Sequence, residues 1–600
     1  MCMGQTKRLN KQTLTPVYKS NLLMYFKLTT LSAAVVLCLT SQAQAQTLIR
    51  PDAGSTLQQQ GAQPLTVPRA APQVLPQGFA PKPALDALPS ASVPVKAVTF
   101  TGNTVFTSAE LAPLIANLVG STASLTELNN AAGKVRSYYR ERGYFLAQAY
   151  LPRQDVTAGT IEITVLEAYV GKVKATSKPA TRLKETVAQS VLNANLKPDS
   201  VITESSLERP LLILSDMPGV AVKSSLGSGN AIGTADIDVE VSNTSAGFVT
   251  GSIDADNHGS TFTGAYRLGA NLVINNATGY GDKLTARAQI ALENTRSNLA
   301  RIAWQTPLGY YGTQVGVSYT KLNYLLIKDF AALQAEGDAS IASAFIAHPI
   351  VRSRGFNLNA QLGYDSKRLE DRVLSVASTE TRSINNTRIG LQGDWRDSLA
   401  GGGLNIFSLG LTNGKLSINQ AAVAAADQAP GGANTQGAFS KTNVDLLRLQ
   451  TVTNEFSLLG SLNAQFASRN LPSAEKMSLG GPNGGSGVRA YPVGEASGDQ
   501  GYVGTFEARY TNPAWSIANA ATTVSAFYDY GSITISKNPL PGLASNNNNR
   551  SLKGAGFGVT LAKDGDFSLK AALAWRLGNN KPLSGADRMP RFWLQASKAF

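Results

Sequence analysis

The stretch FNLNAQLGYD, Phe356–Asp365, decides the fold, because apolar and polar side chains alternate along it. Apolar residues fill the even positions, and the odd positions carry Asn357, Asn359, Gln361 and Asp365. A period of two residues places one set on each face of a β-strand. The same alternation recurs in DKLTARAQIALEN (Asp282–Asn294) and FSLKAALAWRLG (Phe567–Gly578). The pattern predicts strands with one apolar face and one polar face.

This alternation runs from Ser245 to Phe600, and its apolar faces could meet either lipid or one another. A soluble sandwich uses strands of about five or six residues, whereas these segments run about ten, the length of a tilted membrane-spanning strand. Residues 245–600 also exceed what a single sandwich core uses. Aromatic residues near segment ends suggest a membrane girdle: Trp304, Tyr364, Trp395, Tyr510, Trp575 and Trp593. We predict a mainly β fold, a transmembrane antiparallel barrel of about 16 strands.

Residues 1–45 are typical of a secretory signal peptide. A basic leader precedes the apolar run LTTLSAAVVLCLT (Leu28–Thr40), and Ala43 and Ala45 give the small-x-small pattern of a cleavage site. A membrane anchor is the alternative, but the apolar run is short for a bilayer span. Both cysteines lie in this leader. The mature chain therefore offers no disulfide, thiol nucleophile or cysteine metal ligand.

Charge and histidine content narrow the function classes. The net charge of +14 falls to +9 when the five basic residues of 1–45 are removed, and the remaining cations are scattered. This distribution disfavours nucleic-acid binding. The two histidines, His258 and His348, lie far apart, and neither zinc spacing nor a phosphate-binding loop motif occurs. We expect no enzyme activity, no catalytic residues, no metal and no cofactor.

Two small α+β domains precede the predicted barrel. Residues 46–93 form a Pro-rich linker, in which PDAGSTLQQQ (Pro51–Gln60) predicts a short helix. Residues 94–173 show the order β-α-α-β-β, with a second helix that Gly143 ends. The order partly repeats in 174–243, which predicts a second domain of the same kind.

A glycine-rich loop over 467–500 is long for a connection between two strands. It carries Arg489, and the strand TTVSAFYDYGS that follows turns Asp529 into the barrel. A carboxylate in a narrow polar lumen needs a cationic partner, so these two residues could form a latch that holds the loop inside. The alternative is that both groups are only hydrated. The motif positions around the pair are Val488, Tyr491, Phe527 and Gly531.

The motifs VRAY (Val488–Tyr491) and FYDYG (Phe527–Gly531), the tandem domains and the terminal Phe600 together resemble the TpsB family of two-partner secretion transporters. These are the haemolysin secretion/activation proteins (ShlB, FhaC and HecB) of the BamA-like superfamily. LPRQDVTAGTIEITVLEAYVGKV (Leu151–Val173) resembles the end of the family's first POTRA domain and the start of its second.

The resemblance implies a 16-stranded barrel over 245–600, POTRA domains at 94–173 and 174–243, and a plug helix within 46–93. It also implies that Arg489 in a lumen-inserted loop meets Asp529 of an F-x-D-x-G strand, and that Phe600 is the barrel's C-terminal signal.

One position departs from the family motif. The family usually has glycine where this chain has Ala490. If the backbone there is left-handed, alanine costs about 1 kcal/mol relative to glycine. The geometry of the loop tip is therefore open.

The resemblance implies an outer-membrane translocator of a Gram-negative bacterium, with its POTRA domains in the periplasm. It would secrete a large β-helical exoprotein (an adhesin, a cytolysin or a contact-dependent toxin) through the lumen, with outer-membrane lipid, lipopolysaccharide and the barrel-assembly machinery as further partners. The alternatives are a BamA-like assembly factor, which usually carries more POTRA domains, and a passive porin, which needs none. Strand parity predicts a lumen wall that contains Arg287, Arg301, Arg388, Arg396 and Arg509.

Overall fold

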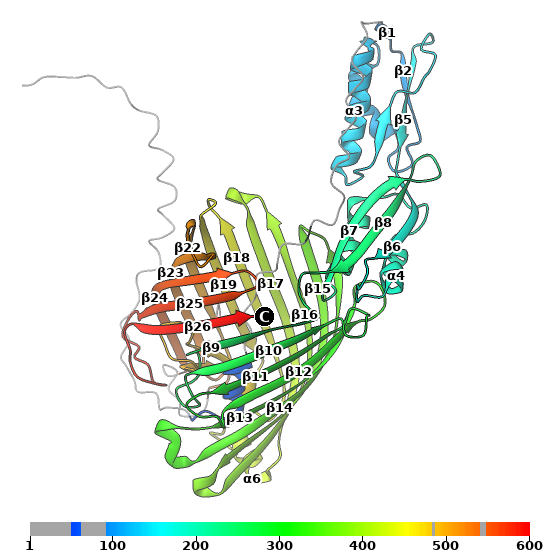
Figure 1. Ribbon diagram of the computed structural model, residues 1–600. Coiled ribbons are helices and arrows are strands. Elements are labelled where there is room, and N and C mark those ends of the chain that lie inside the picture. The colour runs from blue at the N-terminus through cyan, green and yellow to red at the C-terminus, as the bar shows by residue number, and fades with distance from the viewer. Residues whose placement is uncertain (1–49, 62–71, 73–91, 483–486, 540–547) are drawn as a thin grey trace, which may run out of the picture. The chain divides into compact units, whose positions relative to one another are not determined.

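The computed structural model describes residues 50–61, 72, 92–482, 487–539 and 548–600 (Figure 1). The expected signal peptide and most of the expected linker lie outside these residues. No helix in the described part of the chain is long and apolar enough to cross a membrane.

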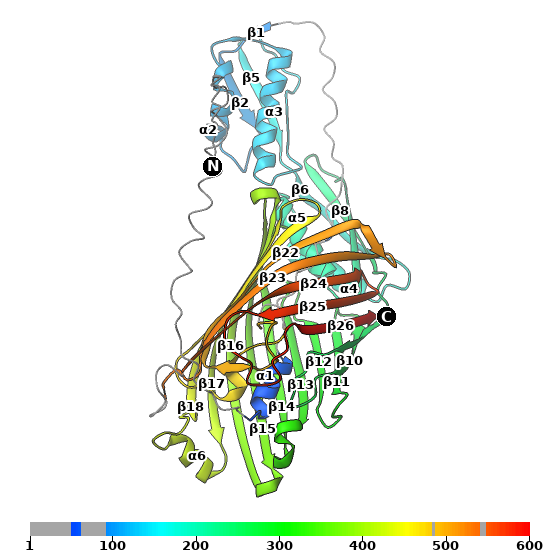
Figure 2. The ribbon, with the colours of Figure 1, turned by 90° about the vertical axis from the view of Figure 1, so that its left-hand side faces the viewer.

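The C-terminal part is a closed antiparallel barrel of sixteen strands, which confirms the predicted fold class. Sequential strands are neighbours in the wall, as β22 to β26 are in Figure 2, and β26 pairs with β9 to close it (Figure 1). The barrel strands are β9 (Val249–Asp256), β10 (Arg267–Asn275), β11 (Lys283–Ala291), β12 (Asn298–Pro307), β13 (Gln314–Leu325), β14 (Ala335–Arg352), β15 (Phe356–Val373), β16 (Ser378–Asp397), β17 (Gly403–Ile418), β18 (Gly437–Thr451), β19 (Phe456–Ala467), β22 (Gln500–Ile517), β23 (Ala520–Thr534), β24 (Asn549–Lys563), β25 (Phe567–Arg576) and β26 (Arg591–Ala599).

The strands differ in length more than the sequence pattern predicts. Strands β10 and β11 have 9 residues each, but β14 and β15 have 18 and β16 has 20. The expectation of about ten residues is wrong for this side of the barrel, because the long strands continue to pair past the 9–11 residues that cross a bilayer. The closing pair is short, since β26 meets β9 only from Gln595–Asp256 to Ala599–Ser252.

Short connections and helices complete the barrel. They are α1 (Ala53–Gly61), η2 (Lys328–Leu333), η3 (Leu374–Val376), η4 (Leu399–Gly401) and α6 (Ala421–Gln428), together with η5 (Ser473–Glu475), β20 (Met477–Leu479) and β21 (Ala496–Gly498) between β19 and β22.

Two small α+β units precede the barrel. The first contains β1 (Ser92–Pro94), β2 (Ala97–Thr101), α2 (Ser108–Leu111), η1 (Ala112–Leu118), β3 (Thr122–Ser124), α3 (Leu125–Glu141), β4 (Gln148–Tyr150) and β5 (Thr160–Leu166), with the sheet order β2-β5-β4. The second contains β6 (Tyr169–Ser177), α4 (Glu185–Asn195), α5 (Glu204–Ser215), β7 (Val220–Ser228) and β8 (Thr234–Asn243), with the order β6-β8-β7. Strand β6 pairs with β8 from Tyr169 onward, so the second sheet begins before the expected boundary at 174.

The helices of the first unit follow from local sequence signals. Reciprocal capping boxes start α2 at Thr107 and α3 at Ser124, where each cap residue bonds a glutamate three residues later. Apolar residues at helical spacing bury one face of α3 against the sheet. The chain leaves the helix through Gly143, whose φ of 88° favours glycine.

A buried carboxylate, Glu167, lies between β5 and β6 and is 2% exposed. It accepts hydrogen bonds from the backbone nitrogens of Thr104 and Val105, both at 2.9 Å, and from the Tyr139 hydroxyl at 2.6 Å. Burial acts to raise the pKa of Glu167, but the bonds from Thr104, Tyr139 and Val105 outweigh it and lower the pKa. Burial and the bond to Glu167 raise the pKa of the Tyr139 hydroxyl. This network ties the β2–α2 connection to α3.

We predict that Glu167→Gln destabilises the first unit by about 2–4 kcal/mol at pH 7, because one amide cannot accept all these bonds. The folded pKa lies below the unfolded value of 4.5, so the carboxylate stabilises the fold above that pH and loses this effect as the pH falls through the folded pKa. Hydrogen exchange of α3 in the full chain should therefore be faster in the variant at pH 7, with a smaller difference near pH 4. Glu141→Gln, on the exposed end of α3, is the control. Equal exchange rates at pH 7 would contradict this role.

Candidate functional site

The connection between β19 and β22, the expected lumen loop over 467–500, folds into the barrel. Strands β20 and β21 pair as a short hairpin within it, and residues 483–486 lie outside the described part. Apolar side chains of the loop are buried against the inner face of β22–β25. The cluster contains Leu479, Val488, Ala490, Tyr491 and Ala496 from the loop and Val503, Phe527, Ile533, Leu552 and Ala574 from the wall.

The structure brings Arg489 and Asp529 together. The guanidinium donates from Nε to Oδ2 at 2.8 Å and from Nη2 to Oδ1 at 2.7 Å, and the Arg489 backbone nitrogen donates to Oδ2 at 3.1 Å. Asp529 is fully buried and also accepts from the Thr505 hydroxyl at 2.9 Å. The bidentate geometry gives this pair both strength and a fixed orientation.

Two further wall residues hold the Arg489 side chain. Its Nη1 donates to Glu507 at 2.9 Å, and its guanidinium lies 3.3 Å from the centre of the Phe527 ring. Alternation along β22 and β23 places Glu507, Phe527 and Asp529 on the inner face of the wall. The sequence motif identified the aspartate and the phenylalanine, but it did not identify the second carboxylate.

Ala490 occupies the loop tip without strain. It is not among the described non-glycine residues with positive φ, so the left-handed conformation that would disfavour alanine does not arise. Its side chain is buried against Gly554, where an added Cβ would lie 2.4 Å from the Ala490 Cβ. The glycine in the wall therefore makes room for the alanine in the loop.

Trp593 corrects one expectation from the sequence. Its Nε1 donates to the Arg489 carbonyl oxygen at 2.6 Å, and the side chain is 5% exposed. Its neighbours in β26, Phe592 and Leu594, are 49% and 38% exposed on the opposite face. Trp593 therefore belongs to the lumen and not to an aromatic girdle, because alternation turns it inward.

A second charged contact holds the other end of the lumen loop. Glu475 in η5 is 2% exposed and meets Lys367 Nζ of β15 at 2.5 Å and Lys441 Nζ of β18 at 2.9 Å. Asn386 of β16 donates to the same carboxylate at 2.8 Å. This site could not be predicted from the sequence, since nothing in the order of residues shows that the loop reaches these strands.

Three of the five predicted wall arginines form ion pairs with acidic neighbours. The ion pairs are Arg287 Nη1 with Asp254 at 3.0 Å, Arg388 Nε with Asp365 at 2.8 Å, and Arg509 Nε with Glu507 at 2.9 Å. Arg301 lies opposite Arg287 in the ladder between β11 and β12. Arg396 lines a cavity at the end of β16. The described residues contain no group of three or more His, Cys, Asp or Glu placed to hold a metal ion.

Helix α1 lies between the lumen loop and the wall. The Ala53 backbone nitrogen donates to Asp371 Oδ1 of β15 at 2.7 Å, and Arg382 Nη1 of β16 meets Asp52 at 3.2 Å. On the loop side, the Ser473 hydroxyl donates to Asp52 at 2.6 Å. The helix begins two residues later than the sequence pattern predicts.

The close approach of α1 to η5 depends on a glycine. A Cβ added at Gly54 would lie 2.3 Å from the Ser473 hydroxyl oxygen and 2.6 Å from the Ala474 nitrogen. Gln58 donates its side-chain amide to the Ala474 carbonyl oxygen. The helix and the loop thus share one packed surface inside the barrel.

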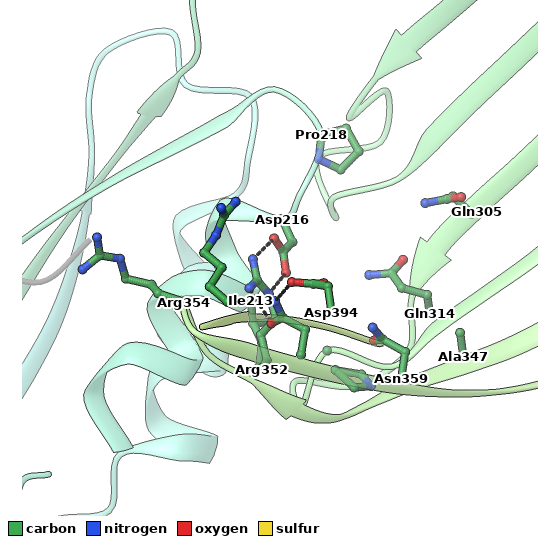
Figure 3. Close-up of a pocket in the computed structure, with 14 residues that line it drawn as sticks. Ile213, Asp216, Pro218, Gln305, Gln314, Ala347, Arg352, Arg354, Asn359 and Asp394 are labelled. Atoms are coloured by element: carbon green, nitrogen blue, oxygen red, sulfur yellow. Dashed lines mark hydrogen bonds and ion pairs between the residues drawn. The ribbon is translucent and has the colours of Figure 1, made fainter. Parts of the chain in front are cut away.

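The second α+β unit joins the barrel through a bidentate ion pair. Figure 3 shows Asp216, at the end of α5, facing Arg352 of β14, with Nε and Nη2 both 2.7 Å from its carboxylate oxygens. Arg352 also donates to Asn357 at 2.9 Å, and Asn357 donates to Asp394 of β16 at 3.0 Å. Arg209 of α5 adds a bond to the Pro349 carbonyl oxygen at 2.7 Å.

Comparison with known proteins identifies the family. Residues 233–561 match the haemolysin secretion/activation protein family ShlB/FhaC/HecB, and residues 93–168 match the ShlB-type POTRA domain. The heme/hemopexin transporter protein HuxB of Haemophilus influenzae (strain 86-028NP) is 31% identical over 497 residues, which cover 82% of this chain and 84% of that protein. The outer membrane transporter CdiB of Dickeya dadantii is 22% identical over 431 residues, covering 70% of this chain and 73% of that one.

The fold agrees with a solved relative. The structure of CdiB from Escherichia coli superposes with a TM-score of 0.67 at 21% identity, covering 88% of this chain and 94% of that one. The family match covers more than half of the sequence, and the barrel, its lumen loop and the POTRA unit agree with it. The chain therefore belongs to the haemolysin secretion/activation protein family, the two-partner secretion transporters of the outer membrane.

Proposed function

We propose that the POTRA units recognise an unfolded exoprotein in the periplasm and that the barrel lumen carries it across the outer membrane. The observation that supports this most is that the chain fills its own lumen with α1 and the lumen loop. Both are held there by hydrogen bonds and ion pairs and do not belong to the wall. Such segments can close the lumen at rest and move out of it when an exported chain passes through.

Recognition would use free sheet edges. The sheet orders β2-β5-β4 and β6-β8-β7 leave β2, β4 and β7 with one edge that no described strand pairs, whereas the outer edge of β6 bonds residues 199–201 and the Gln189 side chain. An extended polypeptide can add to such an edge through backbone hydrogen bonds, with little demand on its sequence. A substrate that is unfolded in the periplasm fits this mode of binding.

The exported partner would be a large β-helical exoprotein, either an adhesin, a cytolysin or a contact-dependent toxin. The relative HuxB is named a heme/hemopexin transporter, so a partner that handles this ligand is a further candidate. Outer-membrane lipid and lipopolysaccharide would surround the barrel. The barrel-assembly machinery would engage the last strand, which ends at Phe600.

Deleting residues 94–243 should abolish secretion of a large β-helical exoprotein that is co-expressed with this chain, because no POTRA sheet edge would remain to receive it. The barrel should still reach the membrane and keep its heat-dependent shift in gel mobility. Secretion is measured as exoprotein in the culture medium. Continued secretion by the deletion variant would show that the POTRA units do not dock the substrate.

Arg489→Ala should release the loop tip, since it leaves Asp529 buried and unpaired, a loss of about 3–5 kcal/mol. We expect faster proteolysis of the lumen loop and at least tenfold less secretion, with a normal heat-dependent gel shift. Arg489→Lys should restore little of the secretion or of the loop's resistance to proteolysis, because lysine cannot form the bidentate pair that arginine forms. Arg509→Gln, which removes the other cation beside Glu507, is the matched control.

An exchange of charges gives a stricter test of the latch. Because Glu507 also faces Arg489, the exchange of Arg489→Asp with Asp529→Arg has to be made together with Glu507→Gln. We expect this variant to protect the loop better than either single substitution. If it does no better, the pair does not act as a latch.

Removing residues 46–61 should raise the conductance of the barrel in planar bilayers, because α1 occupies part of the lumen. Gly54→Leu should have the same effect in the full chain, since a side chain there collides with Ser473 and Ala474. Gly133→Leu, in a helix of the first POTRA unit, is the control, because only a side-chain atom of Arg136, 3.9 Å away, would lie within 4 Å of its Cβ. Unchanged conductance in both α1 variants would exclude a plug.

A further inference from the structure

A cavity of about 450 Å³ lies where the end of α5 faces the periplasmic ends of β12–β16 (Figure 3). Ile213, Asp216 and Pro218 line it from the second POTRA unit, and side chains of the barrel wall line it from the other side. Its volume falls in the range of cavities that bind small ligands or short peptide segments.

One part of the lining is already paired. The bonds from Asp216 through Arg352 and Asn357 to Asp394 connect the POTRA unit to three neighbouring barrel strands. These groups have little capacity left for a ligand. Their effect is to fix the end of α5 above the barrel mouth, so the cavity has a defined shape.

Four other polar side chains are free. Gln305 of β12, Gln314 of β13, Asn359 of β15 and Arg396 of β16 line the cavity, and none makes a hydrogen bond or ion pair with another described residue. Each amide offers one acceptor and two donors. A chain of peptide bonds presents the complementary groups at regular spacing.

The outer strand of the neighbouring sheet leads to this cavity. Strand β7 begins at Val220, two residues beyond Pro218, and is an outer strand of its sheet. An extended chain that adds to this edge would therefore have one end beside the free amides. The free side-chain amides of the cavity thus lie near the start of this outer strand.

We propose that this cavity binds the main chain of the exported polypeptide, in extended form, as it passes from the edge of β7 into the lumen. Gln305, Gln314 and Asn359 hydrogen-bond its peptide groups, and Arg396 donates hydrogen bonds to its carbonyl oxygens or acidic side chains. This inference rests on the proposed secretion function and adds the place where the substrate enters the barrel.

The first test fills the cavity. Gln314→Trp should lower secretion of a co-expressed β-helical exoprotein at least tenfold, whereas Ser318→Trp should change it less than twofold. Ser318 lies on the same face of β13, four residues further along, and does not line the cavity. Combining Gln305→Ala, Gln314→Ala and Asn359→Ala should lower secretion about three- to tenfold without any added bulk. Heat-dependent gel mobility shows that each barrel is folded.

The second test measures direct contact between the cavity and the exported polypeptide. A photo-crosslinking amino acid at Gln314 should capture an exoprotein stalled by a folded C-terminal fusion, whereas the same group at Tyr319, which is 50% exposed on the lipid side, should not. Normal secretion by Gln314→Trp, or no adduct at position 314 while the unmodified chain secretes, would overturn the cavity as a subsite. If the unmodified chain secretes nothing, the proposed function itself fails.

Discussion

The whole structure depends on the closure of the sheet. In the hydrocarbon layer every backbone N–H and C=O must find a partner within the protein, so a membrane-spanning sheet cannot leave an edge. Here the ladder between β26 and β9 removes that edge. Closure also creates a lumen, and any segment that enters it has to satisfy its own polar groups against the inner face. The charged contacts of the lumen loop follow from this requirement.

The lumen loop meets this requirement at two separate places on the wall. At its tip, Arg489 is paired with Asp529 and Glu507 on β22 and β23. At its start, Glu475 is paired with Lys367 and Lys441 on β15 and β18. A buried charge is costly to leave unpaired, since removing one partner costs about 3–5 kcal/mol. The loop thus spans the lumen between two anchors, and neither anchor can separate from the wall without new partners or water.

The alternation of side chains was enough to predict the barrel, because the apolar residues of each strand lie on the face that contacts lipid. The same parity, together with the family motif, predicted that Arg489 meets Asp529. Trp593 was misassigned because its position near a strand end was given more weight than its parity. Glu475 was missed for a different reason. Its lysine partners lie on strands distant in the sequence, and only the path of the loop through the lumen brings them together.

The two segments in the lumen are not held equally well. Helix α1 is held by the pair of Asp52 with Arg382 and by hydrogen bonds to Asp371 and η5, but Thr56 Oγ1 and Gln60 Oε1 are buried without a hydrogen-bond partner among the described residues. Each unsatisfied group opposes burial by about 1–3 kcal/mol. At the loop start, donors from Lys367, Lys441 and Asn386 converge on Glu475, and Asn386 Oδ1 is the buried atom there without a hydrogen-bond partner among the described residues. Under the proposed plug role, α1 would therefore leave the lumen before η5, and η5 would be the surface that α1 rejoins.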